Sequence, residues 1–278
     1  MTFIAILVLV LAAVGMLSWI QQRRRPRPGR HERISLLVPF RSDGAERQIN
    51  WEWLEAYWLD VMPPNTEIIM GTNEDTPFCK TNAVNEAFKK ATGDIIVILD
   101  ADCYIDPNSI LDCARQIRES RSRGLPLWFL PYRRFYRLTF EATAELLLSD
   151  PMVPITFGDP PEDWQFHPYH NTSSGHWWGA LIQIMPREAF ELVGGMDERF
   201  RGWGGEDVSF MRALDTLYGK HRTFNGPVYH LWHPTIPGLW KGTRQWEGQD
   251  GPEMNDWLAY RYDQAVGDPE RMRKVLSA

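Results

Sequence analysis

Cysteine is scarce in this sequence, and the few copies form no familiar pattern. The 278 residues include three, Cys79, Cys103 and Cys113, without a Cys-x-x-Cys pair. Three cysteines at these spacings exclude a disulfide framework, and the missing pair argues against a zinc or dithiol redox site. The sequence therefore favours a reducing compartment.

Basic charge is also missing from most of the chain. The formal net charge of −6 is made up of +5 in residues 21–33 and −11 in residues 34–278. Because proteins that bind nucleic acids contact phosphates through a basic face, an acidic main domain argues against that class. The sequence also lacks internal repeats and low-complexity tracts. With 44% hydrophobic and 24% charged residues, it is typical of a packed globular protein.

One long apolar run stands at the start. Residues 2–20 carry no charged side chain, and as a helix they would extend about 28 Å, nearly the thickness of the hydrocarbon core of a bilayer. A cleaved signal peptide is the alternative, but its basic residues would precede the apolar run, whereas here six arginines follow it. The sequence therefore predicts a single-pass transmembrane anchor over residues 1–20 and a basic juxtamembrane linker over residues 21–33. By the positive-inside rule, residues 34–278 form a cytoplasmic domain.

Short apolar runs alternate with helical patterns from residue 34 onward, which predicts an α/β domain with a largely parallel sheet. The expected strands are 34–38, 67–70, 95–99, 127–130, 180–185 and a strand near 228–231. The expected helices are 46–60, 82–91, a helix that Asp106 caps, a short helix from Pro186 to Gly194, and one from Glu206 to about Gly219. Residues 150–175 are expected to form a long irregular loop of the kind that often carries function.

Two acids follow the third expected strand directly. Asp100 and Asp102 emerge at its carboxyl end, where open parallel sheets bind ligands. Two neighbouring carboxylates repel each other unless a cation neutralises them, and oxygen ligands suit Mg²⁺ or Mn²⁺. The alternative is that the Asp-x-Asp triplet arises by chance and that Asp102 only begins a turn.

Two histidines, His230 and His233, lie near the end of the last expected strand. Imidazole complements carboxylate as a ligand for manganese-like ions, and both rings can face one site if the backbone turns at Pro234. A structural role beside Trp232 is the alternative for either histidine.

A third chemical motif is the turn Gly202-Trp203-Gly204-Gly205-Glu206-Asp207, which precedes a helical pattern. Helix capping by the two acids would explain their position in the first turn. It would not explain the glycines, which let a backbone approach a ligand closely, or the tryptophan. A tryptophan ring beside an acid offers a sugar both a stacking face and a proton acceptor.

These motifs together resemble a known family. Gly179–Phe210, with Gly-Gly-Met-Asp followed by Gly-Trp-Gly-Gly-Glu-Asp, is similar to the C-terminal region of β-1,4-galactosyltransferases and of chondroitin-polymerase-like (family 2-like) enzymes. These are inverting nucleotide-sugar-dependent glycosyltransferases of the GT-A fold. Weaker matches lie elsewhere in the chain, in the order in which the family has them. They are Val38-Pro39-Phe40-Arg41, Lys80 with Asn82, Asp100-Ala101-Asp102, and His230 to His233.

The resemblance implies a fold and a set of roles. The fold would be GT-A, with a Rossmann-like mixed sheet. Asp207 would be the catalytic base, and Glu206 would hold the acceptor or orient the base. Asp102 would bind Mn²⁺ or Mg²⁺ together with His233 or His230. Nucleotide contacts would come from Pro39, Phe40, Arg41, Lys80, Asn82 and Asp100, and sugar or acceptor contacts from Trp203, Gly204 and Gly205.

The chain departs from the family pattern at one position. Many relatives have Asp-Asp-Gly-Ser after the second strand, where this chain has Gly71-Thr72-Asn73-Glu74-Asp75. UDP as the donor nucleotide is therefore an expectation from the family only.

The expected function is metal-dependent, inverting transfer of a hexose or N-acetylhexosamine to a hydroxyl of a glycan, protein or lipid. A lectin-like binding protein would not need the base. A nucleotidyltransferase would need a better phosphate loop than Arg41 to Arg47 provides.

Overall fold

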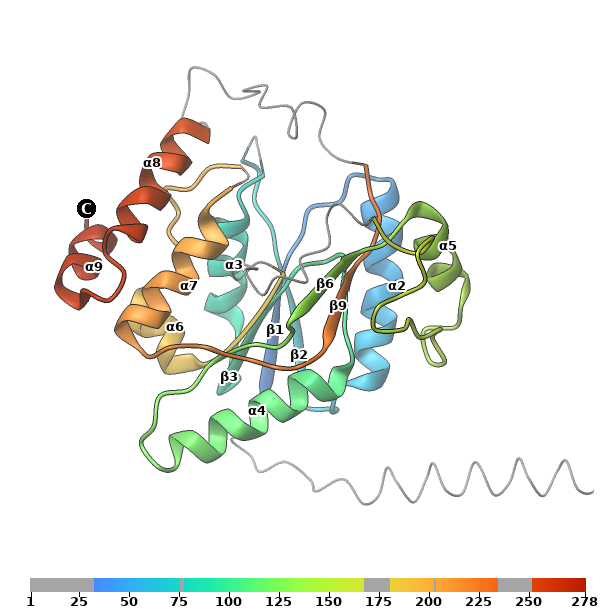
Figure 1. Cartoon of the computed structure of the whole chain (residues 1–278), viewed down its shortest axis with the longest axis horizontal. Coiled ribbons are helices and arrows are strands. Elements are labelled where there is room, and N and C mark those ends of the chain that lie inside the picture. Colours follow the sequence, from blue (N-terminus) through green and yellow to red (C-terminus); the bar gives the residue numbers. More distant parts are fainter. Residues whose placement is uncertain (1–32, 76–77, 168–180, 203, 235–251) are drawn as a thin grey trace, which may run out of the picture. The chain divides into compact units, whose positions relative to one another are not determined.

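The computed structural model describes residues 33–75, 78–167, 181–202, 204–234 and 252–278 (Figure 1). The expected anchor over residues 1–20 lies outside these residues, and so does the expected linker apart from Arg33. Among the helices that are described, none combines the length and the hydropathy that crossing a membrane requires.

A six-stranded sheet forms the centre, in the order β2-β1-β3-β7-β5-β8. Its strands are β1 (Ile34–Pro39), β2 (Glu67–Gly71), β3 (Ile95–Leu99), β5 (Phe129–Leu130), β7 (Ile182–Pro186) and β8 (Arg222–Thr223). β1, β2 and β3 are parallel, as the sequence predicts. β7 is antiparallel to β3 because it starts where β3 ends, with the Asp100 amide donating to the Leu181 carbonyl at 2.9 Å. The sheet is therefore mixed rather than largely parallel.

A second, three-stranded sheet has the order β4-β9-β6. It consists of β4 (Cys103–Tyr104), β6 (Arg134–Arg137) and β9 (Pro227–His230). Cys103 pairs with His230 in the antiparallel register of β4 and β9, and the Leu231 amide donates to the Asp102 carbonyl at 2.8 Å. This short sheet therefore brings the end of β9 beside the residues that follow β3.

Helices cover both faces of the central sheet (Figure 1). They are α2 (Glu46–Val61), α3 (Lys80–Lys90), α4 (Pro107–Arg121), α5 (Phe140–Leu148), α6 (Arg187–Val193), α7 (Glu206–Leu217), α8 (Pro252–Asp263) and α9 (Pro269–Leu276). In Figure 1, α3, α6 and α7 lie on one side of β1–β3 and α2 on the other.

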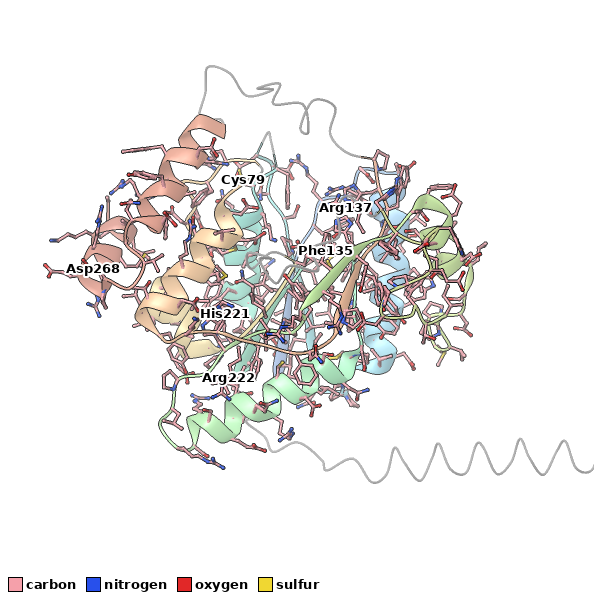
Figure 2. All side chains as sticks on the ribbon, in the orientation of Figure 1. Cys79, Phe135, Arg137, His221, Arg222 and Asp268 are labelled. Atoms are coloured by element: carbon pink, nitrogen blue, oxygen red, sulfur yellow. The ribbon has the colours of Figure 1, made fainter. Side chains whose placement is uncertain are left out.

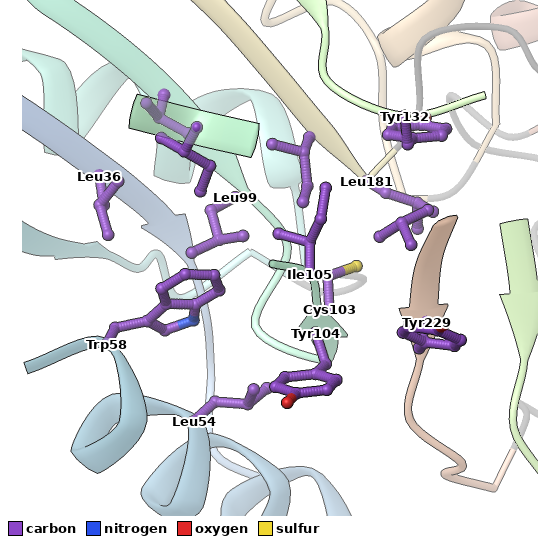
Figure 3. Packing of buried hydrophobic residues seen from close by; sticks show 14 of the residues in the cluster. Leu36, Leu54, Trp58, Leu99, Cys103, Tyr104, Ile105, Tyr132, Leu181 and Tyr229 are labelled. Carbon is purple, nitrogen blue, oxygen red and sulfur yellow. The ribbon is translucent and has the colours of Figure 1, made fainter. Parts of the chain in front are cut away.

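The core consists of two clusters, because successive strand residues point to opposite faces. Leu36 and Leu99 pack with Trp58 of α2 on one face (Figure 3). Leu37 of β1 and Val84 of α3 belong to the cluster on the other face. The strands are thus buried on both faces, which explains their continuous apolar sequences.

Local sequence signals predict several boundaries well. The Asp106 carboxylate accepts from the Asn108 amide at 2.9 Å at the start of α4, and Gly194 ends α6 in the left-handed region at φ 79°. α3 starts at Lys80, two residues before the expected start. Residues 150–167 contain no helix or strand, as expected for a loop, whereas 168–175 lie outside the described residues. The short strands β4, β6 and β8 and the helices α5, α8 and α9 were not predicted.

Candidate functional site

The carboxyl ends of β1, β2 and β3 bring the candidate residues together. Gly71, the last residue of β2, is essential to this arrangement, since a Cβ there would lie 1.7 Å from the Ala83 carbonyl oxygen. Only glycine lets α3 pack this close to β2. The close packing fixes the start of α3, and with it Lys80, at the same edge of the sheet as Asp100.

The Lys80 ammonium lies between two carboxylates. Its Nζ is 2.6 Å from Asp100 Oδ1 and 2.8 Å from Asp207 Oδ1, and all three side chains are largely buried. Burial favours a lower pKa for Lys80, but the charges of Asp100 and Asp207 outweigh it and hold this pKa well above its ordinary value. The structure therefore joins the end of β3 to the start of α7 through a buried cation.

Asp207 is in the first turn of α7. Burial, with a smaller contribution from the neighbouring charges of Glu206 and Asp100, raises its pKa to about 7 despite the opposing effect of Lys80. A carboxyl group that titrates near neutral pH is well suited to accept a proton from a substrate.

Glu206 is buried beside Asp207 and stabilises the glycine turn. Its Oε2 accepts from the Gly204 amide at 2.9 Å, and burial raises its pKa. Gly205, at φ 85°, precedes α7 and packs so closely that a Cβ would lie 3.1 Å from Ala259 Cβ. Trp203, the expected sugar-stacking residue, lies outside the described residues.

Asp102, His230 and His233 form a second group. Asp102 Oδ1 is 3.5 Å from His230 Nε2, and Asp102 Oδ2 is 3.3 Å from His233 Nε2. One ligand atom from each residue can be chosen so that all three lie within 4.8 Å of one another. The β4–β9 pairing brings them together, as the sequence motifs suggested.

The donor set of this group fits a divalent cation. His233 Nδ1 lies 2.9 Å from the Pro234 carbonyl oxygen, which can only accept, so in the neutral ring Nε2 carries a lone pair facing Asp102. His230 Nδ1 is buried with no hydrogen-bond partner among the described residues, and burial lowers the pKa of His230 to about 4. Two imidazoles and a carboxylate are suitable ligands for a manganese-like ion.

A second possible ligand group combines Asp100, Asp102 and Cys103. Burial and the two neighbouring carboxylates hold the pKa of the Cys103 thiol well above its ordinary value. Since metals bind the thiolate, this set is less suitable than the one with two histidines.

The remaining expected nucleotide residues organise the loop after β2. The Phe40 amide donates to the Gly71 carbonyl at 2.9 Å, directly after Pro39 at the end of β1. The Arg41 guanidinium donates to the Asp75 backbone carbonyl at 2.7 Å, and the Asn82 side-chain amide donates to the Asp75 carboxylate at 2.8 Å. Arg41 and Asn82 therefore hold this loop in place, and Lys80 contacts carboxylates instead.

Sequence reasoning missed three contributors. Arg47 Nη2 of α2 lies 3.3 Å from His233 Nε2, Gln183 donates to the Asp207 carbonyl at 3.3 Å, and Arg137 is the register partner of His230 on β6 (Figure 2). Gln183 and Arg137 are far in sequence from the other candidates, and although Arg47 follows Arg41 closely, its partner His233 is far along the chain. Only the pairing of strands and helices brings them to the site.

Two family models match parts of the chain. Residues 66–133 match "Glycosyl transferase family 2", and residues 166–231 match "N-terminal domain of galactosyltransferase". The first region includes Lys80, Asp100 and Asp102, and the second includes Asp207 and His230. The mixed α/β sheet is thus a GT-A-like glycosyltransferase fold, as the sequence motifs implied.

Solved structures show low sequence identity to this chain. The catalytic domain of Drosophila β1,4-galactosyltransferase 7, in complex with xylobiose, has 16% identity and a TM-score of 0.33, covering 70% of this chain and 64% of that chain. The mannosyltransferase PcManGT from Pyrobaculum calidifontis, in complex with GDP-Man and Mn²⁺, has 15% identity and a TM-score of 0.45, covering 99% of this chain and 78% of that chain.

Two curated relatives are more similar in sequence. Human chondroitin sulfate N-acetylgalactosaminyltransferase 2 is 26% identical over 147 residues, which is 51% of this chain and 24% of the relative. The mouse protein of the same name is 32% identical over 104 residues, or 36% of this chain and 18% of the relative. The matched part therefore spans no more than about a quarter of either relative. Together with the family matches, these relatives show that the chain contains a region similar to family 2 glycosyltransferases, followed by a region similar to galactosyltransferases.

Proposed function

We propose that this protein transfers a hexose or N-acetylhexosamine from a UDP-sugar to an acceptor hydroxyl, with inversion at the anomeric carbon. The observation that carries the proposal is the buried Asp207 carboxyl, whose pKa of about 7 suits a general base. It lies in the galactosyltransferase region, and Lys80 links it to the family 2 region. The name of the curated relatives supports an N-acetylhexosamine among the donors to be tested.

The reaction would be a single displacement. The acceptor hydroxyl gives its proton to Asp207 while its oxygen forms a bond to the anomeric carbon. The bond between that carbon and the diphosphate oxygen breaks on the opposite side, and the bonding electrons leave with the diphosphate. Glu206 stabilises the turn that holds Asp207 and, with Trp203, Gly204 and Gly205, would contact the acceptor sugar.

Asp102, His230 and His233 would hold a divalent metal, with Mn²⁺ or Mg²⁺ as the candidates. When bound, such an ion supplies positive charge that neutralises the departing diphosphate. Arg47 adds a fixed positive charge beside His233. Pro39, Phe40 and Arg41 at the end of β1, together with Asn82 of α3, would bind the nucleotide beside the loop that follows β2. Asp100 would face the ribose and phosphate.

The membrane assignment is a separate part of the proposal. Residues 1–20 would anchor the protein in a bilayer, and the arginines of residues 21–33 would keep the catalytic domain in the cytoplasm. The apolar run and the basic residues that follow it support this orientation.

The metal group yields the first test. Mn²⁺ titrated into the purified protein should bind at one site, and Asp102→Asn should weaken this binding at least about tenfold because it removes a charged ligand. Electron paramagnetic resonance of free Mn²⁺ measures the bound fraction. His221→Ala is the control, since His221 follows α7 and pairs with Asp215 instead (Figure 2). Equal weakening in both variants would contradict the assignment.

The base yields the second test. Asp207→Asn should fold and bind donor, yet transfer sugar at least about a hundredfold more slowly, because the amide cannot accept the proton. The assay follows nucleotide release and glycoside formation with a panel of UDP-hexoses, UDP-N-acetylhexosamines and acceptors, in the presence of Mn²⁺.

The control for Asp207→Asn is Asp215→Asn, the same change on the same helix at a residue that pairs with His221. It should leave the rate within about twofold of the parent. Near-parental turnover of Asp207→Asn would exclude the residue as the base. Failure of the parent to transfer any sugar in the panel would count against the proposed function itself.

The membrane orientation yields the third test. Protease added outside intact cells should spare the domain beyond Arg33, because the proposed orientation keeps this domain inside. Detergent permeabilisation before proteolysis is the positive control. Digestion of the domain in intact cells would overturn the orientation.

A further inference from the structure

The Lys80 ammonium contacts both oxygens of the Asp207 carboxylate. Nζ lies 2.8 Å from Oδ1 and 3.0 Å from Oδ2, and it is also 2.6 Å from Asp100 Oδ1. Lys80 begins α3, Asp100 follows β3 and Asp207 begins α7. One side chain therefore joins three elements of the fold at the candidate active site.

These contacts commit Lys80 to the carboxylates. The Lys80 side chain is only 13% exposed, and an ammonium group has three N–H donors. If the ammonium group moved to a nucleotide phosphate, Asp100 and Asp207 would be left buried without their cation, so this exchange of partners is unfavourable. The geometry thus differs from the nucleotide contact that the sequence resemblance implies for Lys80.

The same contacts fix the orientation of Asp207. Each carboxylate oxygen can accept more than one hydrogen bond, so contact with Lys80 leaves acceptor positions on both oxygens. Gln183 of β7 donates to the backbone carbonyl of Asp207 at 3.3 Å and so restrains the other end of the residue. The residue is therefore held at both ends, while its carboxylate remains able to accept a proton.

We propose that Lys80 is a positioning residue, which aims the Asp207 carboxylate at the acceptor hydroxyl and ties it to Asp100, and that it is not a nucleotide ligand. This inference rests on the proposed role of Asp207 as the base. The proposal predicts that loss of Lys80 slows the chemical step. A nucleotide ligand would instead act mainly on the affinity for the donor.

Steady-state kinetics separates the two roles. Lys80→Met should lower kcat about a hundredfold, as expected when a reacting group is misplaced by about 1 Å. The Kd for UDP, measured by calorimetry, should stay within about threefold of the parent. Lys80→Arg keeps the charge and should recover at least about tenfold of the lost rate. Lys89→Met is the matched control on the exposed part of α3, and its kcat should equal that of the parent.

A second measurement needs no turnover. With ¹³C-labelled aspartate, the Asp207 carboxyl resonance, assigned by its loss in Asp207→Asn, reports its titration. Removal of the adjacent cation favours the protonated form, so Lys80→Met should raise the titration midpoint of Asp207 by at least about one pH unit. Lys80→Arg should leave it closer to the parent value. The other charged groups facing Asp207 are Asp100 after β3 and Glu206 on α7, and both stay unchanged.

The outcomes are distinct. An unchanged kcat with a weakened Kd for UDP would overturn the proposal and make Lys80 a nucleotide ligand, and so would an unchanged Asp207 titration. If Lys80→Met fails to fold, Lys80→Gln and Lys80→Arg carry the same comparison. A parent protein that transfers no sugar, but whose Asp207 titration still shifts with Lys80, would contradict the proposed function while retaining the coupling between these residues.

Discussion

The ion pairs of Lys80 are the interaction on which the candidate site depends. Asp100, Asp207 and Glu206 gather at one edge of the sheet, where burial raises the pKa of all three carboxyl groups. Without a cation, neighbouring buried carboxylates repel one another or take up protons. Lys80 contacts two of them directly and favours the charged form of the third. The close packing of α3 on Gly71 is what brings this ammonium group into place.

A second constraint acts on the histidines. The pairing of β4 with β9 covers only two residues on each strand, yet it fixes His230 opposite Cys103 and therefore beside Asp102. His233 reaches the same carboxylate because the chain leaves the strand at His230. The fold thus forms two adjacent groups with different chemistry. One is a carboxyl cluster around a lysine, and the other is a carboxylate with two imidazoles.

The sequence predicts the parts of this arrangement that depend on local patterns. β3 has the expected bounds because its five residues are all buried and apolar, and the cap at Asp106 follows from side-chain chemistry alone. The direction of β7 was not predictable, since a strand buried on both faces has the same pattern in either direction. β4 is too short for a periodic signal. The contact of Lys80 with Asp207 and the position of Arg47 beside His233 depend on contacts across more than a hundred residues of sequence, which no local spacing encodes.

The central claim is that Asp207 acts as a base from a buried site, and the pH dependence of kcat/KM for the acceptor tests it most directly. A base must be deprotonated to work, so the rate should fall about tenfold for each pH unit below a midpoint near 7. At higher pH, where Asp207 is charged, the rate should reach a plateau. A profile that stays flat down to pH 5, measured with saturating donor, would contradict the account.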